Sequence, residues 1–344
     1  MPSPALPLRP IASDIASTLR TTVGQRALTQ EIAAEAVRRD VDTVLFAGVG
    51  GSWASSVAAT MSLGAKATGF GVQNVNAGEF PLTHLGRTGR RTLVIASSHS
   101  GGTPETVAAA QAAAKAGALV VSVARDADNE LARAAEFSLV YGSESTATGG
   151  KYELLEEMSC SLLEAQGLKD GVDELRAALD LIPDATAAAV DETERATAEA
   201  VARLYDADNI FVLGTGRLLG LAYMLSVCYL VEMQRQKSTH LNSADFFHGP
   251  FEIVDPRSTR VIHLMSEDET RPISERVNAF LSRYGREHYV VDPAKLTLPG
   301  IDPAVRGKVA HIAMASVASR IAYHFEPLTG HDLDIRRYMH KVEY

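Results

Sequence analysis

Residues 43–52 read TVLFAGVGGS, an apolar, β-branched run that ends in glycines and leads into an Ala-rich segment. A short run of this kind predicts a strand, a glycine loop and then a helix. The same order returns at Thr92–Ser97, before the helical pattern of Thr103–Ala116, and a further strand pattern follows at Ala118–Ala124. Strands that alternate with helices form a parallel sheet with right-handed crossovers, so the sequence predicts an α/β fold.

A weak internal repeat extends this pattern to the second half of the chain. Residues 209–216 read NIFVLGTG and repeat the strand and glycine loop at 43–50, about 166 residues later. Arg260–Ser266 repeats Thr92–Ser98, and Glu287–Asp292 repeats the strand after Gly117. An offset of this length is typical of a duplicated domain rather than of a solenoid. We therefore expect two domains, residues 1–168 and 169–344, each a parallel sheet flanked by helices.

Composition excludes several classes of function. The chain has 344 residues, 46% of them apolar and 22% charged, which is the balance of a globular protein. Its net charge is −9 and no run of Lys and Arg stands out, so we expect no nucleic-acid partner. We find no apolar run near the ~18 residues of a membrane span and no signal peptide at the start, so a cytoplasmic location is expected. The two cysteines, Cys160 and Cys228, lie in apolar helical patterns and are interpreted as buried, inert thiols.

The sharpest local motif is the stretch SSHSGGTPET at residues 97–106, between a predicted strand and a predicted helix. Open α/β sheets bind ligands at this position. The hydroxyls of Ser98, Ser100 and Thr103 can donate to phosphate oxygens, and the N–H groups of a helix start favour an anion. A helix cap at Thr103-Pro104 is the alternative, but it does not require the hydroxyls and glycines before it.

A second loop, Gly50-Gly51-Ser52, is expected to present N–H groups and a hydroxyl to the same ligand. Its G-x-G-G pattern lacks the third spaced glycine of a dinucleotide-binding fingerprint, and no acidic residue follows the next strand. Dinucleotide binding is therefore not expected, and no metal or redox cofactor is predicted.

Together these motifs resemble the SIS (sugar isomerase) family. Ser98-His99-Ser100-Gly101-Gly102-Thr103 is similar to the S-x-S-G-x-T phosphate loop of SIS domains, with His99 at the variable position. Glu232 and the HGPFE stretch that begins at His248, sixteen residues later, resemble the isomerase domain of glucosamine-6-phosphate synthase and, more closely, the deglycases of 6-phosphorylated fructosamines. The resemblance covers about residue 40 to the end and implies two tandem SIS domains.

The resemblance also implies roles for individual residues. Glu232 would be the base that moves a proton between C1 and C2 of an open-chain amino-ketose phosphate, and His248 the acid. Lys341 corresponds to a lysine that opens or holds the sugar in the synthase, although an ordinary basic tail explains it equally well. Taken singly, Glu232 also fits a solvated helix end and His248 a turn histidine. An amino-sugar-phosphate isomerase or deaminase is the alternative activity, and a non-catalytic sugar-phosphate sensor a further one. The family also implies a homodimer whose active site lies near the subunit interface.

Overall fold

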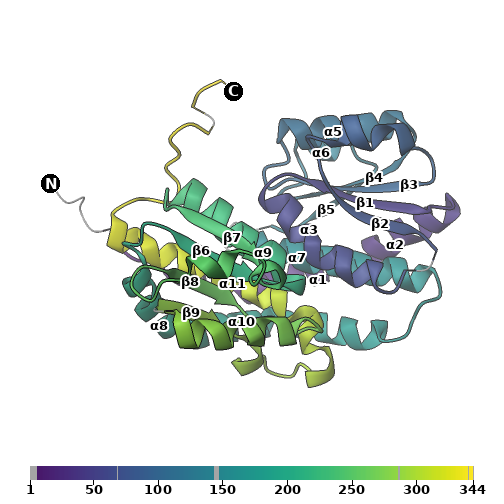
Figure 1. Ribbon diagram of the computed structural model, residues 1–344. Helices are drawn as coiled ribbons and strands as arrows, with labels where there is room; N and C mark the ends of the chain where they lie inside the picture. Colours follow the sequence, from purple (N-terminus) through teal and green to yellow (C-terminus); the bar gives the residue numbers. More distant parts are fainter. Residues whose placement is uncertain (1–5, 68, 143–146, 286, 340, 344) are drawn as a thin grey trace.

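The computed structural model describes residues 6–67, 69–142, 147–285, 287–339 and 341–343. Figure 1 shows two α/β units, the first with its sheet at the upper right and the second at the lower left. Both sheets are wholly parallel, as the alternation of strands and helices predicts.

The first sheet has five strands in the order β2-β1-β3-β4-β5. The central strands are buried on both faces, which matches their continuous apolar sequence. The strands are β1 (Thr43–Gly48), β2 (Gly71–Asn76), β3 (Thr92–Ser97), β4 (Leu119–Ala124) and β5 (Phe137–Val140).

Helices cover both faces of this sheet. One face packs against α1 (Ile15–Val23), α2 (Arg26–Arg38), α3 (Gly51–Gly64) and α7 (Ala147–Ala165). The other face packs against α4 (Phe80–Thr83), the short turn η1 (Leu85–Arg87), α5 (Pro104–Lys115) and α6 (Glu130–Arg133). α1 and α2 are separate helices, because the chain turns at Gly24-Gln25.

The second sheet repeats this winding with four strands in the order β7-β6-β8-β9. They are β6 (Ile210–Gly214), β7 (Ser238–Asn242), β8 (Arg260–Leu264) and β9 (Glu287–Val291). The outer face carries α10 (Arg271–Tyr284) and a cluster of phenylalanines. Short turns complete this half: η3 (Gly216–Leu218), η5 (Ser243–Asp245), η6 (Pro250–Ile253) and η7 (Pro293–Lys295).

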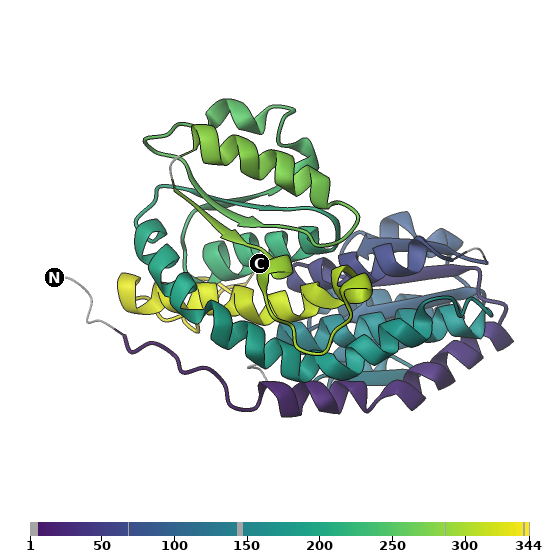
Figure 2. The same cartoon turned by 90° about the horizontal axis from the view of Figure 1, so that it is seen from below.

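A single helical layer joins the two halves. It adds α8 (Val172–Leu204), α9 (Leu219–Tyr223), the π-helix η4 (Met224–Met233) and α11 (Pro303–Thr329) to the helices under the first sheet, and their buried side chains form one continuous core. Figure 2 shows α8 lying along α11, with α1 beside it. The boundary proposed at residue 168 falls between α7 and α8, inside this shared layer.

One helical stretch is long and apolar enough to cross a membrane, contrary to the expectation from the sequence. It is Gly216–Met233, with a mean hydropathy of 1.3 over 18 residues. Half of it is buried inside the protein, where it packs against α3, α11 and the strands β6 and β7. A core helix of a globular protein can have the same length and composition, and this stretch makes the contacts of such a helix.

Candidate active site

The phosphate loop predicted from the sequence connects β3 to α5. Its hydroxyls organise the loop: Ser98 Oγ lies 2.8 Å from Thr103 Oγ1 and accepts the Gly101 N–H at 3.1 Å. Ser100 Oγ accepts the Gly102 N–H at 3.2 Å. Gly101 has φ +67°, and a Cβ there would lie 2.1 Å from Asn129 Cγ, so only glycine fits.

The helix-cap alternative is correct in position, since Thr103 is the N-cap residue of α5 and Pro104 its first residue, but no side-chain cap forms. The Thr103 side chain makes no cap hydrogen bond to α5 and points to Ser98 instead. The first N–H groups of α5 have no intrahelical acceptor, as at every helix start, so they remain available to an anion. The three hydroxyl residues differ in exposure: Ser98 is buried, Thr103 is half-buried and Ser100 is exposed.

The first loop, between β1 and α3, lies beside a buried lysine that the sequence analysis missed. Lys151 Nζ donates to Ser52 Oγ at 2.9 Å, and the lysine is 5% exposed. Its ammonium lies over the Tyr141 ring, 5.3 Å from the centroid. No ion pair joins Lys151 to a carboxylate among the described residues. Burial lowers the pKa of Lys151 to about 8.

Lys151 also links the first loop to the phosphate loop. The hydroxyl of Tyr141, whose ring the ammonium faces, lies 2.8 Å from His99 Nδ1. Desolvation, with Lys151 and Arg125 nearby, lowers the pKa of His99 to about 4, so its imidazole is neutral at pH 7. Lys151 is therefore the buried cation at the centre of the two loops. The local sequence does not single it out, because Lys151 is one of several charged residues in α7 and the others are glutamates.

The second half reaches this site through the π-helix η4. Its Cys228 contacts the first loop: a Cβ on Gly51 would lie 3.5 Å from Cys228 Sγ. Burial raises the pKa of Cys228 to about 12, so the sulfur is a neutral thiol. Cys228 is half-buried rather than buried as expected, and it lies between the first loop and Glu232.

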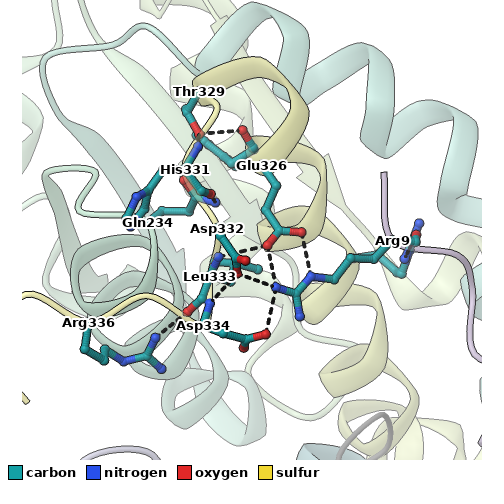
Figure 3. A network of polar contacts seen from close by, with 11 residues as sticks. Arg9, Gln234, Glu326, Thr329, His331, Asp332, Leu333, Asp334 and Arg336 are labelled. Atoms are coloured by element: carbon teal, nitrogen blue, oxygen red, sulfur yellow. Dashed lines mark hydrogen bonds and ion pairs between the residues drawn. The ribbon is translucent and has the colours of Figure 1, made fainter. Parts of the chain in front are cut away.

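Glu232 lies near the end of η4, half-buried and held by an arginine from the C-terminal segment. Arg336 Nε donates to Glu232 Oε1 at 2.9 Å. Figure 3 shows the network that fixes this segment. Arg9 makes two hydrogen bonds of 2.6 Å to Glu326 and also contacts Asp332 and Asp334. The ion pair with Arg336 was not foreseen from the sequence.

The structure does not bring His248 or Lys341 to Glu232 within this chain. His248 is exposed in the turn after β7, and its backbone N–H bonds to Asp245 O at 2.8 Å. No side-chain hydrogen bond or ion pair joins it to Glu232 in the described part of the chain. Lys341 is exposed in the terminal segment, which projects away from the body of the protein in Figure 1. The residues that do come together are the two loops, Lys151, Cys228 and Glu232.

Comparison with known proteins places this arrangement in a family. A family description for the SIS domain matches residues 39–163. Fructosamine deglycase FrlB of Bacillus subtilis (strain 168) is 32% identical over 309 residues, covering 89% of this chain and 94% of the relative. The chain therefore belongs to the SIS family.

Further relatives narrow the class. Fructoselysine 6-phosphate deglycase of Escherichia coli (strain K12) is 25% identical over 313 residues, covering 90% of this chain and 89% of the relative. A Bacillus subtilis crystal structure described as a phosphosugar isomerase superposes with a TM-score of 0.85 at 29% identity, over 97% of this chain and 100% of the other. The chain is an enzyme of this family, with a sugar-phosphate deglycase or isomerase-like function.

Proposed function

We propose that the chain is a deglycase that cleaves a 6-phosphorylated fructosamine into glucose 6-phosphate and a free amine. The observation that carries the proposal is the contact between Cys228 of η4 and Gly51 of the first loop. Glu232 follows Cys228 on the same helix, close enough for its carboxylate to contribute to the raised pKa of the thiol that touches the first loop. A sugar phosphate bound between the two halves would have its phosphate at the first half and its C1–C2 end toward the second.

The reaction balances without an added oxidant or reductant. Glu232 takes a proton from C1 of the open-chain ketoamine, and the electrons of that C–H bond reach the C2 carbonyl, giving an enaminol. Return of the proton at C2 gives an imine at C1, so C1 is oxidised and C2 is reduced within one molecule. Water adds to the imine, and the C1–N bond breaks to release the amine and the aldehyde of glucose 6-phosphate.

The buried charge at Lys151 has a role in this scheme. A desolvated cation with no described carboxylate partner is costly unless the ligand brings a negative charge. The dianionic phosphate of the substrate would supply it beside Ser52 and His99. We assign Lys151 to substrate binding at the junction of the two loops.

The acid of the mechanism is proposed to come from a second copy of the chain. His248 is exposed and makes no described side-chain contact with Glu232. The terminal segment that carries Lys341 exposes three apolar side chains, those of Ile335, Tyr338 and Val342. In a homodimer the partner subunit's His248 would complete the site. Mixing inactive Glu232→Gln and His248→Asn proteins should then restore activity in the heterodimer, whereas a monomer in sedimentation would end this part of the proposal.

The direct test is an assay of products. The protein is incubated with a panel of 6-phosphofructosamines, and glucose 6-phosphate and free amine are measured. Equal amounts of both are expected. Release of ammonia and fructose 6-phosphate from glucosamine 6-phosphate, with no cleavage of the panel, would identify a deaminase instead.

A further inference from the structure

A cavity adjoins the first loop on the side of β2, away from the phosphate loop. Its volume is about 400 Å³, within the range of small-molecule sites. Gly50 lines it, so the cavity is continuous with the loop that carries Ser52. Its floor is β2, at the carboxyl end of the sheet, where open α/β folds place their ligands.

The wall of this cavity is aromatic and comes from both halves of the protein. The rings of Trp53 and Tyr223 meet edge to face with centroids 5.5 Å apart. His240 of β7 packs edge-on against Tyr223 at 4.9 Å. Tyr223 is close enough to Glu232 for that carboxylate to contribute to the raised pKa of the phenol. The wall therefore runs from the cavity toward the proposed base.

Apart from Gly50 and Val75, the remaining lining is polar, and its one carboxylate is Glu79. Amides line the floor, and Gln73 Oε1 lies 3.1 Å from Nε2 of His84, whose Nδ1 lies 2.7 Å from Thr83 Oγ1. The His84 ring is thus held in place by its neighbours. Glu79 is exposed and forms no ion pair with another described residue. Aromatic faces and a carboxylate are the groups that bind an ammonium ion.

We propose that this cavity holds the amine portion of the substrate and favours amines that carry a second positive charge. The inference rests on the proposed deglycase function. With the phosphate at Ser98 and C1 near Glu232, the group on the C1 nitrogen would extend along Tyr223 into the cavity. Glu79 then attracts a distal ammonium and repels a distal carboxylate.

Three adducts of equal chain length isolate this charge effect. They are the 6-phosphofructosyl derivatives of 1,4-diaminobutane, butylamine and 4-aminobutanoate, which end in a cation, a methyl group and an anion. The methylamine adduct, too short to enter the cavity, provides the reference rate for each variant. We expect kcat/KM to fall in the order cation, neutral, anion, by about tenfold or more from first to last, since each partly exposed charge contact contributes up to about fivefold.

Changes at Glu79 test the assignment. Glu79→Gln should remove most of the roughly tenfold ratio between cationic and anionic adducts, because both the attraction and the repulsion are lost, and Glu79→Lys should reverse the order. Glu174→Gln is the control for net charge, because Glu174 lies in the first turn of α8, far from the cavity. The start of α8 lies near Lys66, which donates to the Asp170 carbonyl. Lys66 follows the end of α3, whereas the cavity adjoins the beginning of α3. A ratio that stays within about twofold in both Glu79 variants, with the methylamine adduct still cleaved, would overturn the inference alone. Cleavage of no adduct by the wild type would overturn the proposed function and this inference with it.

Discussion

The loops that follow β3 and β8 occupy equivalent positions in the two sheets but carry opposite chemistry. The first places the hydroxyls of Ser98, Ser100 and Thr103 around two glycines. The second reads Ser266-Glu267-Asp268-Glu269-Thr270, three carboxylates at the point where an anion would bind. Three negative charges there would repel a phosphate, so we expect the anion to bind only at the first loop.

The carboxylates of the second loop have partners within the protein. Asp268 accepts the Arg217 N–H at 2.9 Å, and Glu269 lies 3.1 Å from the guanidinium of the same arginine. Glu267 pairs with Arg306 at 2.7 Å. In the first half, by contrast, Lys151 has no described carboxylate partner. The same position thus serves as structure in one half, where its charges are neutralised. In the other half we propose that it is a ligand site, beside the buried charge of Lys151.

The largest expected effect lies in the second half, at the base. Glu232→Gln keeps the shape of the side chain and removes its ability to take a proton. We expect kcat to fall by about 10²–10⁴-fold while a non-reacting analogue such as glucitol 6-phosphate binds as before. If the variant keeps more than about a tenth of the wild-type kcat, the base lies elsewhere, and Lys341 is the next candidate.

The structural role of the second loop predicts a large loss of stability. The side chains of Asp268 and Arg217 are 2% and 6% exposed, so Asp268→Ala leaves a buried cation with one partner fewer. We expect the free energy of unfolding, measured in urea, to fall by about 3 kcal/mol. Asp128→Ala is the matched control, because its ion pair with Arg133 is exposed and should contribute little. Equal losses in the two variants would contradict the assignment.

The ligand role that we propose for the loop after β3 predicts a change in KM. Replacing Ser98 and Ser100 together with Ala removes two hydrogen bonds to a charged phosphate, so KM should rise by about 10- to 100-fold with a smaller change in kcat. Thr270→Val in the second loop is the counterpart and should leave KM unchanged. An unaltered KM in the double variant would show that the phosphate binds elsewhere.

The smallest expected effect is a pH dependence of stability caused by Lys151, the buried cation without a described carboxylate partner. Its folded pKa of about 8 lies below the ordinary value of 10.5, so the unfolded chain binds the proton more tightly between these two values. Stability of the ligand-free protein should therefore rise with pH across this window, by about 1 kcal/mol from pH 8 to pH 9. Lys151→Met should lack this rise, be at least as stable at pH 7, and bind substrate poorly. A Met variant with the wild-type pH dependence would assign the titration to another group.

The parts of the fold that were predictable are those in which burial marks the sequence. β1, β3, β4, β6, β8 and β9 are apolar, β-branched runs and were found. The strands β2 and β7 read GVQNVN and STHLN and were missed, because each lies at the edge of its sheet and is only partly buried. In a strand of that kind the polar residues hide the pattern.

The site divides in the same way. The hydroxyl loop could be predicted because its residues are nearly consecutive in the sequence and form one hydrogen-bonded turn. Lys151 was not, since its importance comes from Ser52 and Tyr141, which are distant in the sequence and adjacent only after folding. The π-helical form of η4 was also hidden, because an apolar run such as MLSVCYLVEM reads as an α-helix.

Because η4 is a π-helix, we expect the enzyme to be more sensitive to the number of residues in this segment than to their identity. A π-helix spends more residues on each turn than an α-helix and is readily produced by the insertion of a residue into one. Deleting one residue between Met224 and Glu232 would let the segment return to an α-helix. Since each residue of an α-helix turns the chain by about 100° about the helix axis, the deletion would rotate Glu232 by about that angle. The carboxylate would then be turned away from Arg336, although both Glu232 and Arg336 are still present. An in-frame deletion here should therefore silence the enzyme more completely than most substitutions in the same stretch.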